Sequence, residues 1–259
     1  MMRISIVTAC LNNHLTVEQA IQSVIYQTHT NLEHILVDGG STDGTLEIVE
    51  RYTRRISRII SGRDRGLYDA LNKGIQAATG DVVGFLHADD TYADRMAIQK
   101  VIEFFESQKV DSIYGDLIYV DKQNADKVIR YWRAGAFDLA KMRSGWMPPH
   151  PALFVKRSIY EKYGLFDLSY SIAADYDLMM RFLVDRAMTV AYLPEVLVKM
   201  RTGGTSNRNL ANIFKKSAED LRVLKQHQIS RPLMALMRKN LSKIPQWFDK
   251  PVTEKEDRR

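Results

Sequence analysis

Several features that define other protein classes are missing from this sequence. Its 259 residues include one cysteine, Cys10, so the chain can form no internal disulfide and suits a reducing compartment. No stretch approaches the roughly 20 consecutive apolar residues that a membrane-spanning helix requires. The first residues run directly into a strand pattern, without the basic and apolar segments of a secretory leader. We therefore expect a cytoplasmic protein, either soluble or bound peripherally at the inner face of the plasma membrane.

Repeats, low-complexity tracts and a uniform charge of one sign are also missing. The chain is 45% hydrophobic and 26% charged, and its length suits one α/β domain with a small appendage. The formal charge of +6 lies in the tail, because residues 207–259 hold 13 Lys and Arg against 6 Asp and Glu. The main domain is therefore near neutral. We expect no nucleic-acid partner, and the basic tail instead indicates contact with a local anionic surface.

Strand and helix patterns alternate through the first half of the chain. Short apolar runs rich in β-branched residues predict strands at residues 3–8, 32–38, 56–61 and 82–86. Apolar residues at helical spacing predict helices that begin at Val17, with Thr16 as the cap, at Thr45 and at Leu67. Repeated β-α-β units imply a parallel sheet, whose ligands bind at the carboxyl ends of the strands. Three polar clusters fall there, at residues 8–13, 38–43 and 87–90.

The second half does not alternate regularly. It contains predicted helices at residues 93–107 and 175–186, and predicted strands at 111–121, 128–132, 152–155, 189–193 and 196–201. The whole pattern predicts an α/β fold with a mixed, mainly parallel central sheet flanked by helices. A helical appendage follows this fold at the carboxyl terminus.

Two adjacent carboxylates, Asp89 and Asp90, follow the strand at residues 82–86. Close carboxylates repel one another, so they need a metal ion, a basic partner or open solvent. Mg²⁺ and Mn²⁺ suit them, because such sites combine one or two carboxylates with substrate phosphates. The alternative is a helix cap, in which Asp90 or Thr91 would begin the next helix.

The segment at residues 37–45, V-D-G-G-S-T-D-G-T, closes one strand with an acid and opens a helix. Its glycines let the backbone come close to a ligand. The first strand is followed by T-A-C-L-N-N rather than by G-x-G-x-x-G, which disfavours an NAD-dependent oxidoreductase.

Taken together, four motifs resemble the family 2 glycosyltransferases of the GT-A fold, such as those of bacterial polysaccharide biosynthesis. They are I-S-I-V-T-A-C-L-N-N, V-D-G-G-S-T-D-G-T, D-R-G-L-Y-D-A-L-N-K-G-I and G-D-V-V-G-F-L-H-A-D-D, in the family's order and spacing. The resemblance covers roughly residues 3–205. It implies a Rossmann-like domain at 1–206, with a nucleotide-sugar-binding half at 1–110 and an acceptor-binding half at 111–206. A basic helical tail at 207–250 would follow, and we expect residues 251–259 to be disordered.

The resemblance implies a donor site at the carboxyl ends of the strands. Thr8 and Asp38 would contact the nucleobase, and His87-Ala88-Asp89 takes the Asp-x-Asp position of the family, with His87 departing from it. A structural or acceptor-facing role is the alternative for His87. Asp89, with Asp90 next, would hold Mn²⁺ or Mg²⁺, which stabilises the charge on the departing diphosphate. The implied nucleotide-sugar contacts are Thr8, Asn12, Asp38, Asp64, Arg65, Lys73, His87, Ala88, Asp89 and Arg201.

The segment A-A-D-Y-D-L-M-M-R at residues 173–181 resembles the acidic motif that begins a helix in the family. The resemblance assigns Asp175 as the general base that deprotonates the acceptor hydroxyl, and it leaves Asp177 structural or supporting. Favourable interaction with the helix dipole is the other explanation for an acid here. Family membership implies a single in-line displacement with inversion.

Two further segments resemble parts of the family's site. The Pro-rich loop at residues 147–151 resembles the loop that faces the acceptor, which makes Trp146 and His150 candidate acceptor contacts. A rigid connector is the alternative. The Gly-rich segment at 201–206, which begins with Arg201, is either a flap over the pyrophosphate or a simple surface loop.

The tail contains a predicted amphipathic helix from Ser230 to about Ile244. Its apolar and basic residues separate onto two faces, and Trp247-Phe248 follows it, a pattern typical of membrane-surface binding. Packing on the domain, or on a twin subunit in a homodimer, is the alternative. The apolar face holds Leu233, Met234, Met237, Leu241 and Ile244, and the basic face holds Arg231, Arg238, Lys239 and Lys243.

The resemblance predicts an inverting hexosyl- or N-acetylhexosaminyltransferase. It would move a sugar from a nucleoside diphosphate donor to a hydroxyl of a glycan or lipid-linked glycan, in bacterial surface polysaccharide or oligosaccharide assembly. UDP is the default nucleotide, with GDP and dTDP open. Two alternatives remain: a synthase that transfers the sugar to polyprenyl phosphate, and a non-catalytic nucleotide-binding module.

Overall fold

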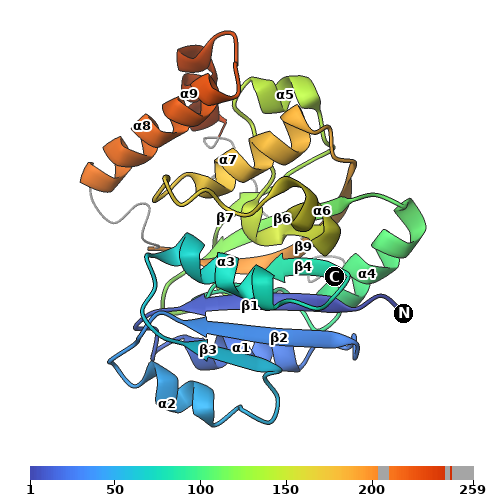
Figure 1. Ribbon diagram of the computed structural model, residues 1–259, viewed down its shortest axis with the longest axis vertical. Helices are drawn as coiled ribbons and strands as arrows, with labels where there is room; N and C mark the ends of the chain where they lie inside the picture. Colours follow the sequence, from blue (N-terminus) through green and yellow to red (C-terminus); the bar gives the residue numbers. More distant parts are fainter. Residues whose placement is uncertain (204–209, 243–245, 247–259) are drawn as a thin grey trace, which may run out of the picture.

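Four parallel strands form one half of the central sheet, in the order β3-β2-β1-β4 (Figure 1). The computed structural model describes residues 1–203, 210–242 and 246. Cys10 pairs with Asp38 and Asp38 pairs with Ser61, so the carboxyl ends of β1, β2 and β3 lie side by side. The strands are β1 (Ile4–Cys10), β2 (Leu32–Asp38), β3 (Arg58–Ser61) and β4 (Val82–Phe85).

Helices cover both faces of these parallel strands. Val17 of α1 packs with Leu36, while α3 packs with Val37 on the opposite face, since successive strand residues point to opposite sides. Gly74 allows α3 to come close to β1, because a Cβ at this position would lie 2.2 Å from Cγ1 of Val7. These helices are α1 (Val17–Ile25), α2 (Thr45–Glu50) and α3 (Leu67–Ala77).

The second half extends the sheet with both strand directions. β8 pairs antiparallel with β4, β6 pairs antiparallel with β8, and β9 pairs parallel with β6. β7 and β5 pair antiparallel with β6 and β9, and α4 packs against the same sheet. This arrangement confirms the predicted α/β fold with a mixed sheet. The elements are β5 (Thr91–Tyr92), α4 (Ala97–Gln108), β6 (Ser112–Val120), β7 (Val128–Trp132), β8 (Leu153–Lys156) and β9 (Val190–Arg201).

One continuous strand, β9, replaces the two strands expected at residues 189–193 and 196–201. The register against β6 shifts near Pro194, because Tyr114 pairs with Tyr192 while Asp116 pairs with Val196. Pro194 lies in this irregularity, where its missing N–H leaves no gap in the ladder. The strand therefore continues through a residue that normally ends one.

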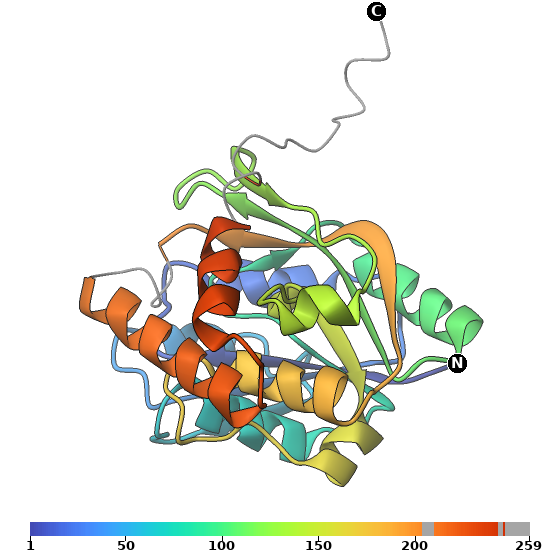
Figure 2. The ribbon, with the colours of Figure 1, turned by 90° about the horizontal axis from the view of Figure 1, so that it is seen from above.

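The remaining helices gather on one side of the sheet (Figures 1 and 2). α7 (Ala174–Met180) continues into a π-helical turn at Arg181–Asp185, which together match the helix expected at residues 175–186. α8 packs against α7, and α9 packs against α8. The other elements are α5 (Leu139–Arg143), the 3₁₀ turn η1 (His150–Ala152), α6 (Arg157–Tyr163), α8 (Leu210–Gln226) and α9 (Pro232–Leu241).

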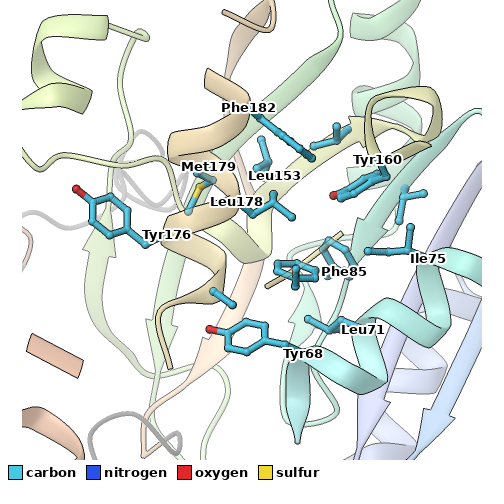
Figure 3. Close-up of a cluster of buried hydrophobic side chains, with 14 of the residues drawn as sticks. Tyr68, Leu71, Ile75, Phe85, Leu153, Tyr160, Tyr176, Leu178, Met179 and Phe182 are labelled. Atoms are coloured by element: carbon cyan, nitrogen blue, oxygen red, sulfur yellow. The ribbon is translucent and has the colours of Figure 1, made fainter. Parts of the chain in front are cut away.

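A large apolar cluster joins α7 to the parallel half of the sheet (Figure 3). Leu178 and Phe182 belong to the same buried cluster as Phe85 of β4 and Leu71 of α3. Each such side chain contributes about 1.5–3 kcal/mol when fully buried. The start of α7 is therefore fixed relative to the end of β4, although about 90 residues of sequence separate them.

The tail helix α9 turns its apolar side chains away from the protein. Leu233, Met237 and Leu241 are 64%, 62% and 59% exposed, whereas Ala235 and Lys239 are buried. Lys239 was expected on the basic face with Arg231 and Arg238, but it is buried and its Nζ lies 2.7 Å from Asp220 of α8. Burial lowers the pKa of Lys239, and the Asp220 carboxylate opposes that effect.

Several sequence predictions concern residues outside the described part of the chain. The boundary expected at residue 206 and the disorder expected at 251–259 are among them, as are Ile244, Trp247 and Phe248. The division into the predicted segments therefore stays a prediction. Within the described residues, no helix combines the length and apolarity needed to cross a membrane.

Candidate active site

The loops that follow β1 and β2 are joined by hydrogen bonds. Asn12 N donates to Ser41 Oγ (2.9 Å), and Thr42 N donates to Asn12 Oδ1 (2.9 Å). Asn12 has a left-handed backbone with φ of 55°, which asparagine adopts more readily than most residues. These bonds fix the position of Asn12, a predicted nucleotide-sugar contact, at the carboxyl ends of the two strands.

Asp38 and Thr8, the predicted nucleobase contacts, have fully buried side chains. The Asp38 carboxylate accepts hydrogen bonds from the backbone N–H groups of the following turn and from Ser61 Oγ (3.0 Å). Thr8 Oγ1 lies 3.0 Å from Nε2 of His34 on β2. Burial lowers the pKa of His34 to about 4, so this imidazole is neutral at pH 7. Both predicted contacts therefore bond inside the protein, at the β1–β2 side of the site.

The Asp64 corner lies directly beside the end of β2. A Cβ added to Gly39 would lie 2.5 Å from Asp64 Oδ2, and the same carboxylate accepts a bond from Gly66 N (2.9 Å). Arg65 and Lys73 both pair with Asp69, at 3.0 Å and 3.5 Å. The structure thus brings Asp64 next to the β2 turn, with one cation, Arg65, just before helix α3 and another, Lys73, on it.

The adjacent carboxylates Asp89 and Asp90 have contrasting surroundings. Asp90 is 1% exposed and accepts a bond from Arg201 N (3.0 Å), while its Oδ2 has no partner. Burial, followed by the charge of Asp89, raises the pKa of Asp90 well above its usual range. Asp89 is partly exposed, and its carboxylate makes no hydrogen bond or ion pair with another described residue. Ala88, which precedes them, is buried against α1.

Arg201 holds the loop that carries these acids. Its Nη1 donates to the backbone oxygen of Asp89 (2.8 Å), and its Nη2 donates to Gln19 Oε1. The side chain is 7% exposed. The guanidinium predicted for the pyrophosphate therefore bonds to the protein here, and residues 204–206 of the predicted flap lie outside the described residues.

Asp175 lies in the first turn of α7 and is partly exposed. Its charge acts on His87 at the end of β4 and on His150 in η1, so residues far apart in sequence form one cluster. Burial lowers the pKa of both histidines, and Asp175 opposes this effect in each case. Tyr68 of α3 donates its hydroxyl to Ile172 O (2.6 Å) and lies 3.2 Å from Asp175 Oδ1.

The two predicted acceptor contacts occupy different positions. His150 stacks on Phe85 with ring centroids 5.3 Å apart, and its buried Nε2 has no hydrogen-bond partner. Trp146 is partly exposed, and its ring centroid lies 6.1 Å from that of Tyr114 and 6.4 Å from that of Phe137. The charge of Asp175 opposes the lowering of the His150 pKa by burial.

A comparison of the sequence with known families decides what kind of protein has this site. The model described as Glycosyl transferase family 2 matches residues 5–164. The chain belongs to this family. The glycosyltransferase is 32% identical over 217 residues to a PGL/p-HBAD biosynthesis glycosyltransferase of Mycobacterium bovis, covering 82% of each protein. It is 29% identical over 184 residues to an uncharacterized glycosyltransferase of Mycobacterium tuberculosis, covering 69% of this chain and 68% of that one.

Solved structures confirm the fold of this glycosyltransferase. TarS of S. aureus (residues 1–349) superposes with a TM-score of 0.69 at 16% identity, covering 98% of this chain and 77% of TarS. The mannosyltransferase PcManGT from Pyrobaculum calidifontis, in complex with GDP-Man and Mn²⁺, gives 0.66 at 17% identity, covering 92% and 69%. TarS has also been solved with UDP and with UDP-GlcNAc.

The side chains at the end of β4 suit a cation that is held partly by the substrate. In residues 1–203, 210–242 and 246, no three His, Cys, Asp or Glu side chains gather closely enough to hold a metal ion. Asp89 nevertheless presents one open carboxylate, and Mg²⁺ sites commonly combine one or two carboxylates with substrate phosphates. The open carboxylate of Asp89 thus fits a cation that is also bound by substrate phosphates.

Two residues that bond to the acids of α7, Tyr68 and His227, were not predicted. Tyr68 lies within D-R-G-L-Y-D, so the motif offered a signal, although no role was attached to it. His227 of the tail bonds through Nε2 to buried Asp177 (3.0 Å) and through Nδ1 to Asp185 (2.6 Å). No sequence pattern links His227 to Asp177, because the two meet only through the packing of α8 on α7.

Proposed function

We propose that this glycosyltransferase moves a sugar from a UDP-sugar to a hydroxyl of a glycan or lipid-linked glycan, with inversion at the anomeric carbon. The observation that carries the proposal is two partly exposed carboxylates, Asp175 in the first turn of α7 and Asp89 after β4, whose charges both act to raise the pKa of His87. The relatives support it, because TarS binds UDP-GlcNAc and PcManGT binds GDP-Man.

Asp175 is the proposed general base. The acceptor oxygen attacks the anomeric carbon, its proton passes to the Asp175 carboxylate, and the bond to the diphosphate breaks with its electron pair going to the leaving group. Such a base must come within about 2.6–3.2 Å of the acceptor hydroxyl. The hydroxyl of Tyr68, 3.2 Å from Asp175 Oδ1, supports one carboxylate oxygen and leaves the other for the acceptor.

Asp89 is the proposed ligand for Mn²⁺ or Mg²⁺ in the donor complex. When bound, the cation supplies positive charge that stabilises the diphosphate as it leaves. Asp90 supports this site from beneath, since its carboxylate accepts the Arg201 N–H and aligns the turn that presents Asp89. Mn²⁺ in the PcManGT complex supports the choice of metal.

The remaining donor contacts are proposed around the ends of β1 and β2. Asp64 beside Gly39, together with Arg65 before α3 and Lys73 on α3, suits the nucleotide and its phosphates. Asp38 and Thr8 would contact the nucleobase only by exchanging one of the bonds that they make within the protein. His150 is a proposed acceptor contact, because its buried Nε2 lacks a hydrogen-bond partner within the protein.

The outer face of α9 is the proposed contact with the inner membrane surface. Exposed apolar side chains project from this helix, and every exposed charged residue in the described part of residues 210–242 is basic. Apolar side chains flanked by cations suit an anionic lipid surface, where each cation adds about 1 kcal/mol. The exposed basic residues are Lys215, Arg222, Lys225, Arg231 and Arg238.

Vesicle sedimentation tests this contact. Vesicles of phosphatidylglycerol and phosphatidylcholine should sediment the protein, and phosphatidylcholine alone should not. The variant L233S/M237S should remain in the supernatant, whereas L168S, at an exposed leucine outside the tail, should sediment normally. Equal sedimentation of L233S/M237S and the wild type would remove α9 from the proposal.

Thermal denaturation with a panel of nucleotides tests the donor site. UDP, GDP and dTDP are each added with Mn²⁺ or with EDTA, and we expect UDP with Mn²⁺ to raise the Tm most. A ligand present at 100 times its Kd stabilises the folded state by about 2.7 kcal/mol, which is readily measured. If no nucleoside diphosphate raises the Tm in the presence of Mn²⁺, the proposed function is wrong.

A further inference from the structure

A carboxylate of the tail holds the loop that leads into α7. Glu219 of α8 accepts hydrogen bonds from Ile172 N (2.8 Å) and Ala173 N (3.0 Å) through Oε2. It also accepts bonds from Ser171 N (3.1 Å) and Ser171 Oγ (2.7 Å). Three consecutive backbone N–H groups therefore point at one side chain, which comes from a helix more than 45 residues later in the chain.

The loop needs this partner because its own residues cannot supply one. Ala173 stands at the N-cap of α7 and has no side-chain oxygen to accept a backbone N–H. Successive N–H groups form a concave site that favours an anion. Burial raises the pKa of Glu219, but the bonds from Ser171, Ile172 and Ala173 outweigh it and lower the pKa overall, so the side chain is charged at neutral pH.

The same loop is fixed from its other side by Tyr68. Ile172 donates its N–H to Glu219 and accepts the Tyr68 hydroxyl at its carbonyl oxygen, so both faces of this peptide segment are bonded. Tyr68 also touches Asp175, three residues farther along. Movement of the loop would therefore move Asp175 relative to His87 and the end of β4.

We propose that Glu219 is a positioning residue for the general base Asp175, so that α8 is part of the catalytic apparatus rather than an appendage. The inference rests on the proposed role of Asp175. α8 is firmly anchored for this task, because Val223 and Leu224 are fully buried and Asp220 pairs with buried Lys239 of α9. Figures 1 and 2 show α8 lying alongside α7.

The test compares E219A and E219Q with E50Q, a control at an exposed carboxylate on α2 that no site residue contacts. We expect kcat for UDP release from a UDP-sugar to fall about 10-fold to 100-fold in E219A, since small displacements of a catalytic group have costs of this size. E219Q keeps one acceptor oxygen, so its kcat should fall less than that of E219A. The KM for the donor and the Kd for UDP with Mn²⁺ should change less than twofold in both variants.

Hydrogen exchange supplies a readout that does not depend on turnover. The amides of Ser171, Ile172 and Ala173 should exchange faster in E219A than in the wild type, and E50Q should match the wild type. Unchanged exchange in E219A overturns the proposal, and so does an unchanged kcat. Equal losses in kcat and in UDP affinity would indicate general destabilisation and would also overturn it.

The variant D175N separates this inference from the proposed function. If D175N loses turnover while E219A keeps it, the base assignment stands and the positioning role of Glu219 is wrong. If D175N retains turnover, the assignment of the base is itself wrong, and Glu219 then positions no base.

Discussion

The two acidic segments of the active site, Asp89-Asp90 after β4 and Asp175-Tyr176-Asp177 at the start of α7, share one arrangement. In each segment one carboxylate is partly exposed and the other is almost completely buried. Each buried member accepts a hydrogen bond from an arginine, Asp90 from the backbone of Arg201 and Asp177 from the guanidinium of Arg181. In the proposed mechanism the exposed member faces the reaction, and the buried member is bonded within the protein.

The two segments differ in how the buried charge is compensated. Asp177 has basic partners in Arg181 and His227, which lie 3.2 Å and 3.0 Å away. Asp90 has only a backbone N–H and one unpartnered oxygen, and burial raises its pKa. Asp177 is thus paired with two basic side chains that anchor α7, whereas burial disfavours the charged form of Asp90. In the proposed mechanism the two exposed acids have different roles, metal ligand for Asp89 and general base for Asp175, while the two buried acids are supports.

The largest effect that this comparison predicts is loss of turnover when the exposed acid of α7 is replaced. Asp175→Asn removes the proton acceptor and keeps the shape, so kcat should fall by about 10²–10⁴, the usual contribution of a general base. The Kd for UDP with Mn²⁺, measured by calorimetry, should stay within about twofold. A variant that still turns over at the wild-type rate would show that Asp175 is not the base, whereas absence of turnover in both the wild type and the variant would support the non-catalytic nucleotide-binding alternative.

Much of the fold could be predicted from sequence because its first half is encoded locally. The strand at Leu32–Asp38 was predicted to the residue, since apolar runs and turn residues follow one another with little ambiguity. Lys239 could not be placed in this way. On a helical wheel Lys239 belongs to the basic face of α9. Only the packing of α8 and α9 reveals Asp220 as its buried partner.

The same limit applies to the site. Sequence motifs supplied Asp89, Asp90 and Asp175, and the pattern could not decide which member of the first pair is open. That choice depends on Arg201, which reaches Asp90 across 111 residues of sequence. The contact of Glu219 with residues 171–173 likewise could not be predicted from the sequence, because it depends on the packing of α8 against α7.

The second prediction separates the two members of the β4 pair. Asp89→Asn should weaken the Mn²⁺-dependent affinity for UDP at least 10-fold, because the metal would lose its proposed charged ligand. Asp90→Asn is the matched control and should change this affinity about twofold or less, since an amide oxygen can still accept the Arg201 N–H. Calorimetry of UDP with Mn²⁺ and with EDTA measures both. Equal losses in the two variants would place the metal between both carboxylates.

The smallest predicted effect concerns the bond between His227 and Asp177 of α7, and it depends on pH. Bonds to Asp177 and Asp185 raise the pKa of His227 above 6.5, although burial acts in the opposite direction. A histidine whose pKa is raised by folding stabilises the protein fully below its unfolded pKa, and this contribution is lost as the pH rises through the folded pKa. His227→Gln should therefore lower the free energy of unfolding by about 1.5–3 kcal/mol at pH 6, the usual value of a hydrogen bond to a charged group. At pH 9 the difference from the wild type should be clearly smaller, and urea unfolding at the two pH values measures it. A difference that stays constant with pH would show that His227 contributes by packing alone. The charge compensation of Asp177 and Asp90 would then differ less than their hydrogen-bond partners indicate.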